Sequence, residues 1–396
     1  MAFEVSYDLE NEQQFWDGKY KTKQGAEQLD DIVSTRCHQH DIIDNSLRSF
    51  LNVTTNYKFA AFLLYDGRNS KDDAIFEMMH SEGTFARLVE LVQTESVQED
   101  TRLHQLLLQL LYESSRIQRL TFDDFDAVND AFIVYLLEII ESASDDADDP
   151  YHYPVIRVLL VLNEQYLVAS TSRHANGRGG ITNRVIKAIS THGMTYKTFG
   201  CNLILLLNRE SETSLQLLIL KVLYLLFGNP STAEYFYTND LHVLVDVILR
   251  NLIDLPHDSA AANALRHTYL RVLHPILMHS QISKPPHYKR DELLRLLHLL
   301  VSSGNHFAPV DETTIRLVNR CTSVEWLQPP AADLPANGRG TQSPVEHVAN
   351  GQKEYARRAL GMTVQGGNES STSVLEIAGH TAQPGVQTPS MTKQAQ

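Results

Sequence analysis

The stretch Cys37-His38-Gln39-His40-Asp41 holds residue types that bind transition metals: a thiol, two imidazoles and a carboxylate. A structural zinc site needs four such ligands that converge on one point. No CxxC or HxxxH pattern elsewhere in the sequence supplies the remaining ligands, and the histidines show no recurring ligand spacing. We therefore interpret this stretch as part of a helix surface and predict no metal site.

The stretch Gly177-Arg178-Gly179-Gly180 resembles a phosphate-binding loop only in part. It follows polar residues instead of a buried strand, and it lacks the GK[ST] ending of such a loop. The catalytic patterns GxSxG, HExxH and DFG do not occur, and paired carboxylates occur only in acidic loops such as residues 141–149. We predict no catalytic and no cofactor-binding residues, and we do not expect an enzyme.

The composition narrows the class of protein and the kind of partner. Of 396 residues, 43% are hydrophobic and 21% charged, and the three cysteines are too few and too scattered for a disulfide framework. The net charge of −14 disfavours nucleic acid as a partner. Apolar runs are too short or too interrupted by charge for membrane insertion, and the acidic N-terminus does not look like a targeting signal. We expect a cytoplasmic protein.

The elements that must position any site are predicted to be helices, because two-residue alternation is almost absent from residues 1–328. Residues 238–255 illustrate the pattern, since their apolar residues recur at spacings of three and four. These residues are Leu241, Leu244, Val245, Ile248, Leu249 and Leu252. Thr238 or Asn239 is expected to cap this helix and Pro256 to end it. Asp246, Arg250 and Asp254 lie four residues apart on its other side and are expected to pair weakly.

Further helices are predicted from Asp100 or Thr101 to about residue 120, from Asp123 to about residue 140, and from Ser211 to Phe227. Residues 215–227 of the last of these, LQLLILKVLYLLF, are apolar on nearly all faces, with Lys221 as their only charge. Such a helix must be covered on most sides, which a stack of helical repeats does well.

The chain is therefore expected to form an all-α superhelix of armadillo or HEAT type, with five to seven units of about 40 residues. Apolar helices are expected near residues 88, 106, 134, 160, 205, 220, 245, 270 and 296. We assign residues 1–328 to this domain. Residues 329–396 hold only three of the 52 leucines and one aromatic residue, so we predict a disordered tail.

One short stretch could bind a protein partner. Pro285 and Pro286 precede Tyr288-Lys289-Arg290, and the acids at 291 and 292 suit the first turn of a helix. A helix start explains the prolines and the acids, but it does not explain an aromatic residue next to two cations. That combination is typical of an anchor for a protein partner.

Several long motifs in order resemble one known family. They are GNPSTAEYFYTNDLHVLVDVILRNLIDLP, LRHTYLRVLHPIL, PPHYKRDELLRLLHLLV and TIRLVNRCTSVEWL. They resemble the leucine-rich domain of the WISH/DIP/SPIN family, in particular its fungal members. The resemblance is dense over residues 197–327 and looser over residues 41–166.

The resemblance implies an armadillo-like domain that binds and activates the Arp two/three complex, the actin-nucleating complex of actin-related proteins two and three. Activation by this family needs no preformed mother filament and gives linear filaments, which then seed branched networks at endocytic actin patches. Actin itself would be engaged only indirectly, and the protein would work at cortical patches. The surface-type positions best matched in these motifs are the expected partner-binding residues: Tyr237, Asn239, Asp240, Arg266, His267, Tyr269, Lys289 and Arg290.

Two other functions remain open. An armadillo scaffold could grip an extended peptide of another partner. Scaffolds of that kind use Trp and Asn repeated along a groove, whereas this chain has only Trp16 and Trp326. An enzyme with an unrecognised site is the second alternative.

Overall fold

The computed structural model describes residues 57–69, 74–142, 152–171, 181–256, 259–302 and 310–328. Every regular element in these ranges is a helix, which confirms the predicted all-α class. In chain order the helices are α4 (Tyr57–Asn69), α5 (Ala74–Ser81), α6 (Thr84–Val92), α7 (Glu95–Glu99), α8 (Thr101–Ile117), α9 (Phe122–Ala127), α10 (Asp130–Ser142), α11 (His152–Thr171), α12 (Arg184–His192), α13 (Thr198–Arg209), α14 (Thr213–Gly228), α15 (Thr238–Asp254), α16 (Ala260–His279), η1 (Gln281–Ser283), α17 (Arg290–Val301), α18 (Glu312–Thr322) and η3 (Glu325–Leu327).

Some predictions concern residues outside these ranges. The possible metal ligands at 37–41, the glycine-rich stretch 177–180, most of the acidic stretch 141–149 and the tail 329–396 lie outside the described residues. None of the helices in the described part of the chain is both long enough and apolar enough to cross a membrane.

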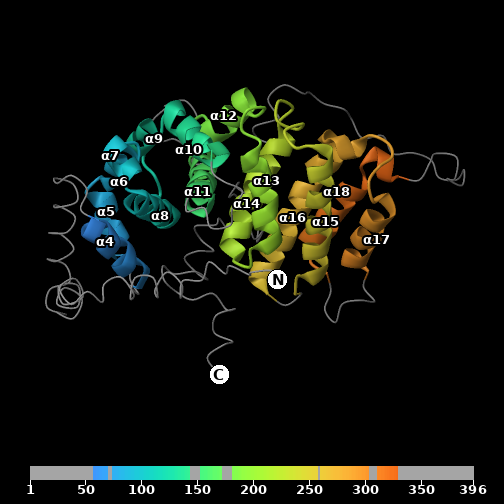
Figure 1. Ribbon diagram of the computed structural model, residues 1–396. Helices are drawn as coiled ribbons and strands as arrows, with labels where there is room; N and C mark the ends of the chain where they lie inside the picture. Colours follow the sequence, from blue (N-terminus) through green and yellow to red (C-terminus); the bar gives the residue numbers. More distant parts are fainter. Residues whose placement is uncertain are drawn as a thin grey trace, which may run out of the picture.

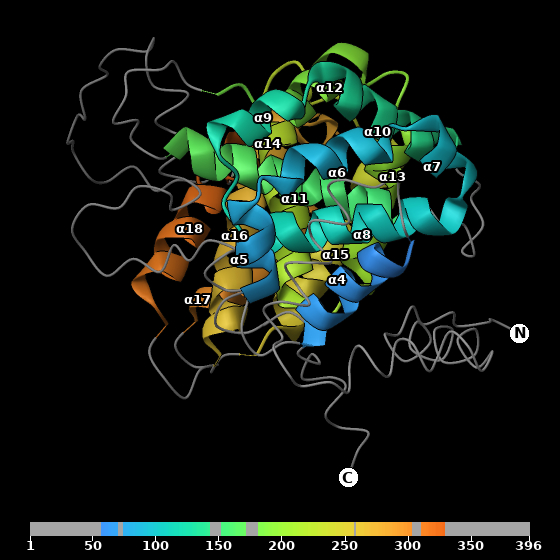
Figure 2. The ribbon, with the colours of Figure 1, turned by 90° about the vertical axis from the view of Figure 1, so that its left-hand side faces the viewer.

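The helices stack in two layers that follow the chain order (Figure 1). In one layer, which we call the α8 layer, α8 packs on α11, α11 on α14, α14 on α16 and α16 on α18. In the other, the α10 layer, α10 packs on α13, α13 on α15 and α15 on α17. Figure 2 looks at the stack from its N-terminal end, with α4, α5 and α6 toward the viewer.

Each repeat unit pairs a helix of the α8 layer with a helix that precedes it in the chain; in the first unit the short helix α7 lies between the two. The pairs α6 with α8, α10 with α11, α13 with α14, α15 with α16, and α17 with α18 are all in contact. The described residues thus form five armadillo-like units, and all nine predicted apolar helices fall in them. The units begin at Thr84, Asp130, Thr198, Thr238 and Arg290. These starts are unequally spaced, so the sequence shows no regular period.

The predicted helix patterns explain most of the core. All six apolar residues on the predicted face of α15 are buried. Asp100 caps α8 as expected, because its carboxylate accepts from the backbone N–H groups of Arg102 and Leu103. Within α14, Lys221 is only 5% exposed. Its ammonium donates to both carboxylate oxygens of Glu164 on α11, at 2.9 and 3.0 Å.

Three local predictions are wrong. The helix expected from Asp123 to residue 140 is two helices, α9 and α10. Thr121 begins the first with a capping box, and the Asn129 side chain accepts from the Phe132 N–H in the first turn of the second. The N-cap of α15 is Tyr237, so Thr238 and Asn239 belong to its first turn.

The third error concerns the polar side of α15. Arg250 does not pair with Asp246 but donates to the Asn208 side chain of α13 at 2.8 Å. Asp246 binds Lys289 at the start of α17 instead. Contacts between neighbouring helices have replaced the pairing expected within the isolated helix, and sequence spacing along one helix does not reveal such contacts.

Candidate functional site

The eight predicted partner-binding residues lie in three places. Tyr237, Asn239 and Asp240 are at the start of α15, and Lys289 and Arg290 are at the start of α17. The other three, Arg266, His267 and Tyr269, belong to α16. The structure brings the first two groups together along α15 and leaves the third group inside the molecule.

The start of α15 presents an aromatic ring beside a cation. Tyr237 is 57% exposed and Asn239 is exposed, while Asp240 is half-buried. The Lys197 ammonium lies 5.0 Å from the centre of the Tyr237 ring, close enough for a cation–π interaction. The Cys201 thiol lies 3.9 Å from a carboxylate oxygen of Asp240. Burial, followed by the nearby Asp240 charge, raises the pKa of Cys201.

The start of α17 is fastened to the same helix. The Lys289 ammonium lies 2.9 Å from an Asp246 oxygen and 3.3 Å from a Glu292 oxygen. Its hydrogen bond to Asp246 raises the pKa of Lys289. The Tyr288 hydroxyl also donates to Asp246, at 3.1 Å, and the Tyr288 ring stacks on His242 with centres 3.8 Å apart. These contacts explain why an aromatic residue and a cation stand next to each other here.

Arg290 holds the C-terminal end of the described domain. Its guanidinium donates to the main-chain carbonyls of Trp326 at 2.9 Å, Leu327 at 3.1 Å and Gln328 at 3.0 Å. The Trp326 ring stacks on His287 with centres 4.8 Å apart. Arg290 therefore has a structural role that is independent of any partner.

The expectation that Arg266, His267 and Tyr269 lie on the surface is wrong. Their exposed fractions are 4%, 3% and 0%. The reason is that α16 packs on α14, α15 and α18 together, so that even its polar residues turn inward. Arg266 donates to the carbonyls of Leu255 and Pro256, and the Tyr269 hydroxyl accepts from the Asn251 amide at 2.7 Å.

His267 helps to position the start of α18. Its Nε2 atom lies 3.0 Å from an Asp311 carboxylate oxygen and 3.1 Å from the Thr314 hydroxyl. Asp311 is the N-cap of α18 and also accepts from the Thr314 N–H. Burial lowers the pKa of His267, and the negative charge of Asp311 opposes this shift.

Sequence reasoning missed several members of the surface that joins the two accessible groups. Val243, at 51% exposure, lies one turn beyond Asn239, and Asp246 follows one turn later. The spacing 239, 243 and 246 along a helix could have indicated a shared face. We define the α15–α17 surface as Tyr237, Asn239, Asp240, His242, Val243, Asp246, Tyr288 and Lys289. An exposed aromatic ring and an exposed apolar side chain beside half-buried charged groups suit binding to a protein.

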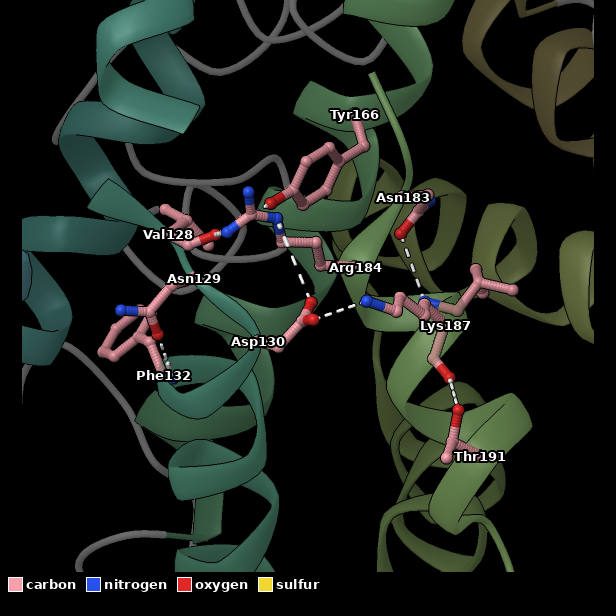
Figure 3. A network of polar contacts seen from close by, with 10 residues as sticks. Val128, Asn129, Asp130, Phe132, Tyr166, Asn183, Arg184, Lys187 and Thr191 are labelled. Carbon is pink, nitrogen blue, oxygen red and sulfur yellow. Dashed lines mark hydrogen bonds and ion pairs between the residues drawn. The ribbon is translucent and has the colours of Figure 1, made fainter. Parts of the chain in front are cut away.

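A second polar network lies away from this surface, between α10 and α12 (Figure 3). Arg184 donates to the Val128 carbonyl at 2.6 Å, and the Tyr166 hydroxyl donates to the same oxygen at 3.3 Å. Asp130 lies between Arg184 and Lys187, as Figure 3 shows, and its hydrogen bond with Lys187 lowers the pKa of Asp130. These contacts fasten the start of α12 to the junction of α9 and α10, so we assign them a structural role.

Among the described residues, no group of three or more His, Cys, Asp or Glu side chains is arranged to hold a metal ion.

Residues 148–293 match the family model described as SPIN90/Ldb17, leucine-rich domain. The chain is 33% identical over 220 residues to Protein dip1 of Schizosaccharomyces pombe, covering 55% of this chain and 58% of that protein. It is 31% identical over 256 residues to Protein LDB17 of Saccharomyces cerevisiae, covering 62% and 49%. It is 33% identical to Protein LDB17 of Eremothecium gossypii, covering 57% and 47%. The chain thus spans about half the length of the curated relatives that it matches.

Two solved structures of designed armadillo repeat proteins are also similar. One covers 72% of this chain and 100% of its own at 12% identity, with a TM-score of 0.35. The other, in complex with the peptide (KR)4, covers 71% and 98% at 11% identity, also with a TM-score of 0.35.

Proposed function

We propose, on the premise that residues 148–293 form a leucine-rich domain of the SPIN90/Ldb17 family, that this protein binds and activates the Arp two/three complex without a preformed mother filament. It thereby nucleates linear actin filaments that seed branched networks. It acts in the cytoplasm at cortical actin patches, contacts actin only through that complex and catalyses no covalent reaction.

The observation that carries this proposal is the match of residues 148–293 to the family model. Those residues include all of α15, with Tyr237, Asn239 and Asp240, and they end just after Lys289 and Arg290. We assign partner binding to the α15–α17 surface, because its exposed aromatic and apolar side chains and its half-buried charged side chains suit a protein contact.

The proposed mechanism treats the Arp two/three complex as an equilibrium between an inactive and an active form. A partner shifts an equilibrium between inactive and active forms only if it binds the active form more tightly. Moving the populations from 1:99 to 99:1 requires about 5.5 kcal/mol of differential binding free energy. A surface that is ordered before binding loses little conformational entropy on binding, so more of the contact energy is available for discrimination.

The contacts around the α15–α17 surface supply that order. Tyr288 and Lys289 both bind Asp246, and Arg290 ties the start of α17 to the residues that follow α18. The start of α17 therefore cannot swing away from α15 without breaking several hydrogen bonds. The shape of the surface is set by the stack and not by the partner.

The test is an assembly assay with pyrenyl-actin, the purified branching complex and no preformed filaments. We expect the protein to shorten the lag of assembly. The double variant Tyr237→Ser/Asn239→Ala should reduce this stimulation at least tenfold, because it removes an exposed ring and an exposed polar side chain from the surface. Both side chains are exposed, so thermal unfolding should not change.

A matched control lies at the other end of the same helix. Ile253 is 59% exposed and Asp254 is also exposed, and neither belongs to the α15–α17 surface. Ile253→Ser/Asp254→Ala should stimulate assembly like the unsubstituted protein. If both double variants remain fully active, the α15–α17 surface is not the site. If the unsubstituted protein has no effect at saturating concentration, the proposed function is wrong.

A further inference from the structure

Two residues in the turn before α17 have a strained backbone. The φ angles of His287 and Lys289 are 50° and 51°, in the left-handed region that residues with a Cβ atom rarely adopt. Among the described residues, the only other one with a positive φ is Gly83, for which this region is not strained. Tyr288 of the α15–α17 surface stands between the two strained residues. The direction of its side chain therefore depends on a backbone conformation that neither neighbour favours.

Trp326, which follows α18, contacts the first residue of this strained turn (residues 287–289). The rings of His287 and Trp326 are stacked, with centres 4.8 Å apart and planes 4° apart. Trp326 is itself fixed, because its Nε1–H group donates to the Leu277 carbonyl of α16 at 2.9 Å. The stack therefore fastens the strained turn to the segment that follows α18.

Helix α15 holds the strained turn from the other side. The Lys289 ammonium lies 2.9 Å from an Asp246 oxygen, and the Lys289 carbonyl accepts from the Leu293 N–H at 2.9 Å. Tyr288 stacks on His242 and donates to Asp246. A residue in an unfavourable backbone region keeps that conformation only where surrounding contacts hold it. Here those contacts come from α15 and from the segment after α18.

The two sets of contacts differ in their relation to the partner. His242 and Asp246 belong to the α15–α17 surface, whereas His287 and Trp326 do not. Substitution of Trp326 therefore removes no proposed partner contact. It does remove one support of the strained turn, and relaxation of His287 to a negative φ would redirect the chain at Tyr288 and Lys289.

The cost of such relaxation appears in affinity. When only a fraction of the molecules has the binding conformation, the apparent dissociation constant rises by the inverse of that fraction. If nine molecules in ten relax, affinity falls about tenfold, while the effect at a saturating concentration is unchanged.

We propose that Trp326 and His287 are positioning residues for the α15–α17 surface. Their stack keeps the strained turn in the conformation in which Tyr288 and Lys289 contact the partner. The inference rests on the proposed function, because it takes the Arp two/three complex as that partner. It assigns to the segment after α18 control over the affinity of a surface that this segment does not form.

The test measures the protein concentration that gives half-maximal stimulation in the pyrenyl-actin assay without preformed filaments. Trp326→Leu should raise this concentration about tenfold and leave the maximal stimulation unchanged. Trp326→Phe, which keeps an aromatic ring for stacking, should raise it less than about threefold. Hydrogen–deuterium exchange of residues 287–293 should be faster in Trp326→Leu, since the Arg290 and Leu293 N–H groups donate to carbonyls of the strained turn.

A second substitution separates positioning from general stability. Asparagine tolerates the left-handed region better than most residues with a Cβ atom, and β-branched residues strongly disfavour it. His287→Asn/Trp326→Leu should therefore recover most of the affinity that Trp326→Leu loses, and His287→Val alone should reproduce that loss. A stack that contributed only stability would show no such recovery, because the double variant lacks both rings.

The matched control is Phe125→Leu, which removes a buried ring of α9 whose centre lies 4.8 Å from that of Tyr166. It should lower the temperature of thermal unfolding but change the half-maximal concentration less than about twofold. The inference alone is overturned by an unchanged half-maximal concentration or unchanged exchange in Trp326→Leu, by a failure of His287→Asn to recover affinity, or by an equal loss in Phe125→Leu. If the unsubstituted protein does not stimulate assembly, the proposed function is wrong and the inference falls with it.

Discussion

Arg290 and Lys289 are adjacent in the chain and carry the same charge, yet their surroundings differ. Arg290 donates to three main-chain carbonyls beyond α18, whereas Lys289 pairs with two acidic side chains near the surface. Hydrogen bonds from a charged group to carbonyls contribute more to stability than a solvated ion pair. We therefore assign a structural role to Arg290 and propose only Lys289 as a partner contact.

We predict that Arg290→Ala lowers the free energy of unfolding by about 2 kcal/mol, and Lys289→Ala by less than about 1 kcal/mol. Urea unfolding of the two variants side by side measures this difference. Equal destabilisation of the two variants would mean that the hydrogen bonds from Arg290 to the carbonyls contribute no more to stability than a surface ion pair does.

Buried histidines make the stability depend on pH. Burial lowers the pKa of His104 to about 4 and that of His274 to about 4. A histidine in the unfolded chain titrates near 6.5. Between these values the unfolded state binds more protons, so the free energy of unfolding falls as the pH drops from 6.5 toward 4.

We predict that His104→Gln, which does not titrate, weakens this pH dependence by about 1 kcal/mol per pH unit. Urea midpoints at pH 7 and pH 5 measure the slope for both proteins. The same fall in stability for the variant and the unsubstituted protein would show that His104 is protonated in the folded state.

The sequence predicts the exposure of individual site residues less well than it predicts the helices. Tyr237 and Asn239 were placed correctly on the surface, because they stand at a helix start outside the apolar pattern. Tyr269 and His267 were misplaced, because polar residues on a helix surrounded by others can be buried if they find partners. Those partners are 18 to 53 residues away in the chain, and no local pattern reveals them.

At the scale of elements, the contact between α11 and α14 depends on a buried ion pair. Glu164 is 1% exposed and Lys221 is 5% exposed. Removing one member of such a pair costs more than removing both, because the remaining charge loses its partner in a place where water cannot replace it. This pair joins the second and third units of the stack.

We predict that Lys221→Met lowers the free energy of unfolding by about 3–5 kcal/mol, and that Lys221→Met/Glu164→Leu recovers much of this loss. Chemical denaturation of both variants checks the prediction. If Lys221→Met/Glu164→Leu is less stable than Lys221→Met, the unpaired charge of Glu164 is not the origin of the lost stability.

Element positions could be predicted well and element ends less well. The nine apolar helices were found from leucine spacing, and the start of α8 from Asp100. The break between α9 and α10 was missed, since Val128 and Asn129 interrupt no hydrophobic pattern. The short helix α12 and the polar helix α18 were missed because neither has a long apolar run.

Across the whole molecule, five helix pairs build a continuous body of two layers. The α15–α17 surface lies on the α10 layer, at the starts of α15 and α17. The stacked architecture was predictable because α14, apolar on most faces, must be covered on several sides at once. The contacts within one layer were not predictable, since neighbours within a layer are separated in the sequence by a helix of the other layer.

We propose that this protein makes the Arp two/three complex nucleate filaments without an existing one. Fluorescence microscopy of single actin filaments, with that complex, the protein and no seeds, tests this most directly. We predict many new unbranched filaments in the first minutes, and few with Tyr237→Ser/Asn239→Ala. New filaments that arise only as branches on older ones, or in numbers equal to those without the protein, would contradict the account.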